Sequence, residues 1–200
     1  MPRPAFYRML ESVAPSRHHA ALAPFWWRPQ VHLALFVHRV DDLSPGLYLL
    51  VRRAGALERF QQMMPVEFEW ARPEGCPPDL DLWRLETADA RRVSAQVSCR
   101  QDIASDGCFS LGMIAELEHS IARRGQWFYP RLFWETGAIG QVLYLEAEAA
   151  GLRGTGIGCF FDDAVHQLFG LTGHEFQSLY HFTIGMPVED TRLTTLPAYT

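Results

Sequence analysis

The chain has 200 residues, of which 48% are hydrophobic and 20% are charged, a balance typical of a globular domain with a sizeable core. Its formal net charge of −5, with eight histidines, gives no electrostatic footprint for nucleic acid. The opening residues MPRPAFYRML lack the apolar segment of a signal peptide, and runs such as VHLALFV are too short to span a bilayer. We therefore expect a single cytoplasmic domain, residues 1–200, with no nucleic-acid or membrane partner.

The first predicted elements form a hairpin. Residues 31–40, VHLALFVHRV, are apolar and β-branched, which favours a buried strand. The turn-forming residues DDLSPG follow, and LYLLVRR then has the pattern of a second strand. Further along, residues 86–104 carry Val93, Val97 and Ile103 at helical spacing and predict a helix, and CFSLGMIAEL predicts a buried strand.

The cysteines Cys76, Cys99, Cys108 and Cys159 have neither CxxC spacing nor histidines at metal-ligand distances. We expect four reduced thiols and no metal site.

Residues 130–150 have the strongest helical pattern, with Pro130 at an acceptable position in the first turn. One face of this helix carries Gly137, Gly140, Tyr144 and Ala147. Each glycine costs a helix about 1 kcal/mol relative to alanine, so we expect another backbone to approach this face. That backbone belongs either to the same chain or to a second subunit.

A cluster of glycines follows this helix. Gly151 is predicted to end the helix in the left-handed conformation. A helix that runs into glycines is the reverse of a dinucleotide-binding fingerprint, and no P-loop Lys-Ser/Thr follows. Gly154, Gly156 and Gly158 have two interpretations: a strand with kinks or bulges, or a bare backbone against which a flat ligand lies.

The last elements complete a mixed order of helices and strands. TGIGCFF predicts a strand, DDAVHQLFGL a short helix, and SLYHFTIGMPV a final strand. Helices and strands intercalated around a central sheet, with at least one hairpin, predict the α+β class.

The segments WETGAIGQVLYLEAEAAGLRGTGIGCFFDDAVHQLFGL and SLYHFTIGMPVEDTRL resemble the C-terminal half of nitroreductase-superfamily flavoproteins, and most closely the branch of the SagB-type azoline dehydrogenases. HLALFVHRVDDLSPGLYLLVRR and SCRQDIASDGCFSLGMIAE resemble the same branch. The resemblance implies a nitroreductase-like fold with a central mixed or antiparallel sheet flanked by helices. It also implies an interface between two subunits, or two tandem halves, that holds FMN.

The implied activity is that of an FMN-dependent oxidoreductase that transfers hydride through the flavin N5, as a nitroreductase or an azoline dehydrogenase does. NAD(P)H is the implied electron donor, and the substrate is a small molecule or a peptide azoline. A homodimer or a partner half-domain is implied as the assembly.

The resemblance also implies cofactor-binding residues. Gly156, Ile157, Gly158 and Cys159 lie where the family backbone runs beside the isoalloxazine ring. Arg192 matches the position of the basic residue that grips the FMN phosphate, a task that suits a guanidinium fork. Arg28 is the candidate from the segment that precedes the first central strand.

Two departures from the family leave alternatives open. The N-terminal Arg-rich arm that binds FMN is not recognisable in MPRPAFYRML, and Trp26 and Trp27 stand where small groups are expected. One alternative is a degenerate, flavin-free domain that acts as a partner or scaffold. The other is a truncated chain that needs a separate N-terminal segment.

Overall fold

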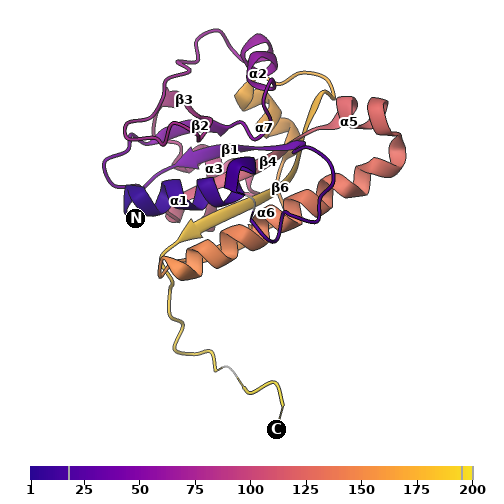
Figure 1. The fold of residues 1–200 in the computed structure, drawn as a ribbon. Helices are drawn as coiled ribbons and strands as arrows, with labels where there is room; N and C mark the ends of the chain where they lie inside the picture. Colours follow the sequence, from indigo (N-terminus) through magenta and orange to yellow (C-terminus); the bar gives the residue numbers. More distant parts are fainter. Residues whose placement is uncertain (18, 195, 200) are drawn as a thin grey trace.

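The computed structural model describes residues 1–17, 19–194 and 196–199, and its centre is one antiparallel sheet with helices on both faces (Figure 1). The strands are β1 (Val31–Val37), β2 (Gly46–Leu50), β3 (Leu82–Thr87), β4 (Phe109–Glu116), β5 (Arg153–Ile157) and β6 (Phe176–Gly185). The helices are α1 (Arg3–Val13), α2 (Leu57–Met63), α3 (Arg91–Val97), α4 (Ile103–Asp106), α5 (Leu117–Arg124), α6 (Tyr129–Ala149) and α7 (Asp162–Phe169), with the single-turn segments η1 (Pro15–Arg17) and η2 (Gln126–Phe128). This architecture confirms the predicted α+β class.

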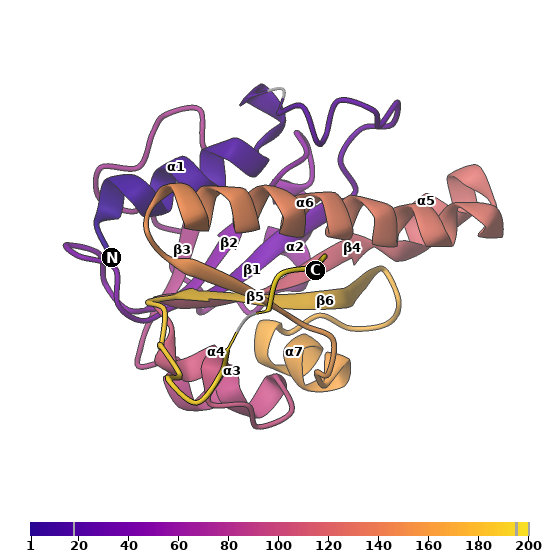
Figure 2. The same cartoon turned by 90° about the horizontal axis from the view of Figure 1, so that it is seen from below.

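The sheet has the strand order β3-β2-β1-β4-β6-β5, so β1 and β4 lie in its centre and β3 and β5 form its edges. All seven residues of β1 are buried, because both faces of this strand are covered. Leu33 and Leu35 belong to a hydrophobic cluster shared with α1 and α6, and Ala34 and Phe36 to a second cluster shared with α2, α3 and α7. Figure 2 shows α1 and α6 on one side of the sheet and α3, α4 and α7 on the other.

The predicted hairpin is confirmed. β1 pairs with β2 in antiparallel register, with Leu33 opposite Leu50 and Val37 opposite Gly46. The predicted strands at 108–117 and 178–188 correspond to β4 and β6, which pair with each other in the middle of the sheet.

The predicted single helix over residues 86–104 is wrong. Its first residues complete β3, which pairs with β2. The helical part is divided into α3 and α4, because Cys99 and Arg100 take left-handed backbone conformations with φ of 55° and 59°. Ile103 is 45% exposed, so the apolar spacing that suggested one continuous buried face does not continue past α3.

The long helix is confirmed as α6, with its proline in the first turn. Gly151 has φ of +70°, and the next N–H, of Leu152, donates to the Ala147 carbonyl at 2.8 Å, as expected for a glycine that ends a helix. The expected close approach of a backbone is wrong within this chain. At Gly140 a Cβ would lie 3.8 Å from the ring of Phe182, and at Gly137 it would meet open space.

Candidate functional site

A strongly basic hollow of about 280 Å³ lies beside α5 and the segment that leads into β1. Its lining residues are Trp26, Trp27, Arg28, Gln30, Arg53, His119, Ser120, Arg123 and Arg124. No carboxylate lines this hollow in the described part of the chain. The guanidinium groups of this set can bind an anion with several acceptor oxygens, whereas Ser120 and Gln30 already donate their hydrogens within the chain.

Two of these arginines are held in place by this chain's own side chains. Arg53 donates to both carboxylate oxygens of Glu116, through Nε at 2.6 Å and through Nη2. The Arg124 guanidinium lies 4.7 Å from the centre of the Phe128 ring and 5.3 Å from that of Trp26. Such contacts restrict the long side chains before any ligand arrives, which lowers the entropy cost of binding.

Glu116 is the buried anchor of this basic group, at the end of β4. Its carboxylate also accepts hydrogen bonds from His32 Nε2, at 2.9 Å, and from Arg59. Burial alone would raise the pKa of Glu116, but the hydrogen bonds from His32 and Arg53 overcome this effect and lower the pKa to about 2. Glu116 is therefore an anion at neutral pH.

His32 is neutral in this arrangement. The backbone N–H of Arg52 donates to His32 Nδ1 at 3.0 Å, so Nδ1 carries no proton and Nε2–H donates to Glu116. Burial lowers the pKa of His32, in agreement with this tautomer. The positive charge near Glu116 therefore comes from Arg53 and Arg59 and not from the imidazole.

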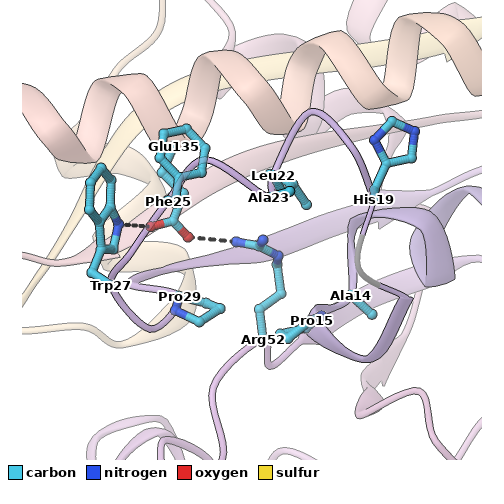
Figure 3. Close-up of a pocket in the computed structure, with 10 residues that line it drawn as sticks. All are labelled: Ala14, Pro15, His19, Leu22, Ala23, Phe25, Trp27, Pro29, Arg52 and Glu135. Carbon is cyan, nitrogen blue, oxygen red and sulfur yellow. Dashed lines mark hydrogen bonds and ion pairs between the residues drawn. The ribbon is translucent and has the colours of Figure 1, made fainter.

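On its other side, the segment that leads into β1 borders a second hollow of about 270 Å³ (Figure 3). Its mainly apolar wall includes Leu22, Phe25 and Trp27, and its polar groups include a buried ion pair of Arg52 and Glu135 with Nη1 and Oε1 2.7 Å apart. The Glu135 carboxylate also accepts from the indole N–H of Trp27 at 3.1 Å and from the backbone N–H groups of residues 30 and 31. Glu135, on α6, thus fixes the segment that carries Arg28.

Glu135 and Arg52 were not identified from the sequence as site residues. The available signal was a glutamate inside the otherwise apolar helical run LFWETGAIG. A buried carboxylate requires partners. Two partners of Glu135, Trp27 and Gln30, lie more than a hundred positions away from it in the chain.

Gly154 and Gly156 lie in a regular strand, because β5 pairs with β6 without a register shift. The interpretation of these residues as kinks or bulges is therefore wrong. A Cβ at Gly154 would lie 2.8 Å from the Phe182 ring, and a Cβ at Gly156 would overlap the Tyr180 hydroxyl. The outward N–H of Gly156 donates to the Tyr144 hydroxyl at 2.8 Å. Aromatic side chains of this chain occupy the space that these two glycines leave open.

Gly158 and Cys159 lie beyond the end of β5, in an exposed segment that leads to α7. Within the described residues, their backbone N–H groups have no hydrogen-bond partner. A Cβ at Gly158 would meet only one ring atom of Tyr180, at 3.9 Å. This part of the glycine segment is open to a ligand, whereas Gly154 and Gly156 are covered and Ile157 is buried.

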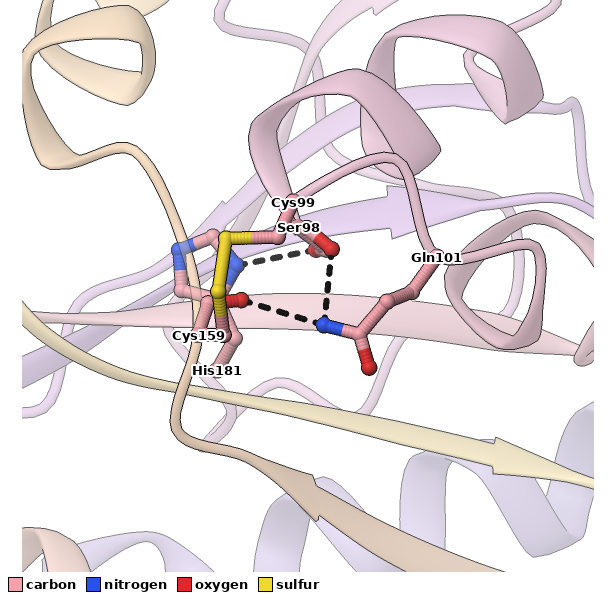
Figure 4. The surroundings of a disulfide bond; sticks show 5 residues. All are labelled: Ser98, Cys99, Gln101, Cys159 and His181. Atoms are coloured by element: carbon pink, nitrogen blue, oxygen red, sulfur yellow. Dashed lines mark hydrogen bonds between the residues drawn. A yellow bond between two sulfur atoms is a disulfide. The ribbon is translucent and has the colours of Figure 1, made fainter.

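The expectation of four reduced thiols is wrong for two of the cysteines. Cys99 and Cys159 form a disulfide, with Cα atoms 5.7 Å apart (Figure 4). The two residues are 60 positions apart in sequence, and only the folded sheet brings the end of α3 to the segment after β5. Cys108 is buried and Cys76 is half-buried, and both are free thiols.

The structure does not bring all predicted cofactor residues together in one hollow. Arg28 lies in the basic hollow. Gly156 to Cys159 lie at the end of β5, and Arg192 follows β6, where its exposed side chain pairs with Asp190 at 2.7 Å. Neither the segment 156–159 nor Arg192 lines the basic hollow.

The acidic, histidine and cysteine side chains and the long helices of residues 1–17, 19–194 and 196–199 bear on metal binding and on membrane insertion. This part of the chain contains no group of three or more His, Cys, Asp or Glu side chains able to hold a metal ion. It also contains no helix both long and apolar enough to cross a bilayer.

Comparison with known proteins gives one family. The model of the family described as "Nitroreductase family" matches residues 50–186, more than half of the chain. No curated protein sequence matches the chain significantly.

Solved structures give the same fold at low sequence identity. A protein described as a nitroreductase from Anabaena variabilis has a TM-score of 0.69 at 21% identity, over 94% of this chain and 34% of that one. One from Ralstonia eutropha has a TM-score of 0.61 at 14% identity, over 95% of this chain and 75% of that one.

The E. coli microcin synthetase McbBCD complex, solved with truncated pro-MccB17 bound, has a TM-score of 0.64 at 15% identity. The match covers 95% of this chain and 65% of that one. This chain therefore spans about a third of the Anabaena protein and just under two thirds of the microcin synthetase chain.

Proposed function

Because the chain belongs to the nitroreductase family, we propose that it is an FMN-dependent oxidoreductase of the SagB-type branch. The basic hollow is the observation that carries this proposal. The other predicted cofactor residues are assigned around it.

The hollow matches the chemistry of the FMN phosphate. Arg28, Arg123 and Arg124 offer guanidinium donors, and Ser120 lines the same wall. A phosphate dianion accepts several charge-assisted hydrogen bonds, each worth about 1.5–3 kcal/mol. With no carboxylate in the lining, the anion meets no direct repulsion there.

The exposed segment at Gly158 and Cys159 suits the edge of the flavin ring. Its free N–H groups can donate to ring acceptors, and the missing side chain at Gly158 allows a flat group to approach. When bound, FMN supplies two-electron hydride chemistry at N5. In this proposal the backbone N–H groups of Gly158 and Cys159 orient the ring by donating hydrogen bonds to its acceptor atoms.

The phosphate hollow and the ring-facing segment do not line one cavity in a single chain, so we propose that the complete site forms between two chains. A homodimer or a partner half-domain provides the second half. The exposed face of α6, which includes Phe133, Trp134 and Leu145, is the proposed contact surface. Arg192 stays a second candidate for the phosphate, because its exposed guanidinium pairs, among the described residues, with the partly exposed carboxylate of Asp190, which a phosphate can replace.

The proposed reaction takes electrons from NAD(P)H and exchanges hydride with a small molecule or a peptide azoline. We place it in the cytoplasm. These assignments rest on the family resemblance, since the apolar hollow near Trp27 is too small and too general in its chemistry to select one substrate.

The bulky segment before β1 favours a second candidate function. Trp27 is bonded to Glu135 and packs on Phe128 at 5.3 Å between ring centres, so it does not swing away to open the place where the family has small groups. A fixed tryptophan at this place is expected of a flavin-free domain that acts as a partner or scaffold for another half.

Flavin titration distinguishes the two functions. We expect the purified chain to be yellow, or to quench FMN fluorescence on titration. The double variant Arg28→Ala/Arg123→Ala removes two exposed guanidiniums, so it should weaken FMN binding about tenfold or more while riboflavin, which lacks the phosphate, is little affected.

Arg92→Ala is the matched control, since Arg92 is an exposed arginine outside this hollow. A colourless protein that leaves FMN fluorescence unchanged would favour the scaffold function. An equal loss of FMN and riboflavin affinity in the double variant would contradict the assignment of the hollow to the phosphate.

A further inference from the structure

The Cys99–Cys159 disulfide has the surroundings of a reactive bond. Cys159 is exposed in the segment after β5, and Cys99 is half-buried at the end of α3. An external thiolate therefore has access to the Cys159 side of the bond. By contrast, Cys108 is buried, and burial raises the pKa of the half-buried Cys76 thiol. These two thiols are poor nucleophiles by comparison.

An arginine-rich part of the surface begins at the residue after Cys99. Arg100 directly follows Cys99, is exposed, and makes no ion pair with another described residue. It lines a shallow hollow together with Arg39, Arg91 and Arg92, and Asp102 and Asp106 line the same hollow.

The backbone at Cys99 is also strained. Cys99 and Arg100 are consecutive non-glycine residues in the left-handed region, which such residues rarely occupy. Breaking the disulfide removes one constraint on this corner, so reduction can release part of the strain.

The two segments are held together by other bonds as well (Figure 4). Gln101 Nε2 donates to the carbonyl oxygens of Ser98, at 2.9 Å, and of Cys159, at 3.2 Å. The N–H of Phe161 donates to the carbonyl of Val97 at 2.8 Å. After reduction these bonds keep the two thiols near each other, so the disulfide can form again without refolding of the chain.

We propose that Cys99–Cys159 is a redox-active disulfide whose substrates are dithiols. A thiolate of the dithiol attacks Sγ of Cys159, the S–S bond breaks, and its electron pair leaves on Sγ of Cys99, which takes up a proton. The second thiol of the dithiol loses its proton and attacks the mixed disulfide. Cys159 leaves as a thiolate and is protonated, and the dithiol becomes a cyclic disulfide. Two electrons and two protons pass to the protein.

The test uses the folded chain without flavin, so its outcome is independent of the proposed FMN site. The protein is treated with millimolar dithiothreitol, alkylated with iodoacetamide and analysed by mass spectrometry, with circular dichroism to follow folding. We expect alkylation at Cys99 and Cys159 but not at Cys108, with the fold retained. After removal of the dithiothreitol, oxidised glutathione should restore the bond.

Two single variants test the site of attack. Cys99→Ser leaves Cys159 as an exposed thiol, and Cys159→Ser leaves Cys99 half-buried. We expect Cys159 in the first variant to react with 5,5′-dithiobis(2-nitrobenzoate) at least about tenfold faster than Cys99 in the second. Equal rates, or a faster Cys99, would overturn the assigned direction of attack.

Three results would overturn the redox activity itself. The bond could resist dithiothreitol until the chain is unfolded in urea, or reduction could itself unfold the chain, and either would make it a structural clasp. Alternatively, the thiols could fail to pair in oxidised glutathione.

Discussion

Glu135 is the residue on which the segment before β1 depends. Its carboxylate accepts from an indole, two backbone N–H groups and a buried guanidinium. We expect Glu135→Gln to lower the free energy of unfolding by about 3–5 kcal/mol, because the Arg52 charge stays buried without its counter-charge. Urea unfolding at neutral pH measures this loss.

Glu148→Gln on the same helix is the matched control. Glu148 pairs with Arg153 at the surface, at 2.8 Å, so its loss should change stability by less than about 1 kcal/mol. Similar effects for the two variants would contradict the role given to Glu135.

The buried imidazole of His181 makes the free energy of unfolding depend on pH. Burial lowers its pKa from 6.5 to about 4, so as pH falls below 6.5 the unfolded chain takes up a proton that the folded chain does not. Stability is therefore full above pH 6.5 and is lost as pH falls toward 4. The loss from this one group is about 2 kcal/mol at pH 5. Burial also lowers the pKa values of His38 and His166, which gives the same sign.

Urea unfolding at pH 7 and pH 5 tests this dependence. His181→Gln should reduce the difference between the two pH values, and His174→Gln, at an exposed position, should leave it unchanged. Glu116 titrates at lower pH and does not interfere, because its pKa of about 2 moves its loss of stability below about pH 4.5. An unchanged pH difference in His181→Gln would show that His181 is protonated normally.

At the scale of elements, two glycines give opposite predictions. Gly154→Ala in β5 places a methyl group 2.8 Å from the fully buried Phe182 ring, so we expect a loss of about 1–3 kcal/mol. Gly137→Ala in α6 meets open space and should stabilise the chain by about 1 kcal/mol through helix propensity. Thermal or urea unfolding of both variants gives the signs, and equal signs would contradict this account of the β5 glycines.

The elements that the sequence predicts correctly are those whose signals are local. β1, β2, β4 and α6 follow from apolar runs, turn residues and a glycine stop, all within a few positions. The break between α3 and α4 was missed because it depends on left-handed conformations at Cys99 and Arg100, and neither residue type signals such a conformation.

The site was less predictable because its contacts are long-range. Arg28 was proposed from the family resemblance, but its neighbours in the hollow, Arg53, Arg123 and Arg124, come from two later parts of the chain. Likewise, the disulfide needs α3 to lie beside the end of β5, which no spacing between cysteines indicates. Pairings of this kind become visible only when the sheet order is known.

At the scale of the whole molecule, the exposed face of α6 leads to a prediction about assembly. Trp134 and Leu145 are 52% and 51% exposed, and Gly137 leaves a gap between them. If a second copy packs there, as proposed, Leu145→Glu should place a charge in the interface and shift the chain to a monomer. Light scattering after size-exclusion chromatography measures the mass.

Val66→Glu is the control for that experiment, since Val66 is 91% exposed and lies outside α6. It should leave the dimer intact. A monomeric parent protein would rule out this homodimer and leave the partner half-domain as the remaining proposal.

The hydrogen bond between Tyr144 and Gly156 has a consequence for colloidal behaviour. β5 is an edge strand, and unpaired N–H groups on such an edge can recruit strands from other molecules and start aggregation. The Tyr144 hydroxyl occupies the outward donor of Gly156, the next-to-last residue of this strand. A tyrosine on α6 therefore removes one free donor from this edge. Tyr144→Phe exposes that donor with almost no change of shape, so we expect it to raise the tendency of the chain to aggregate.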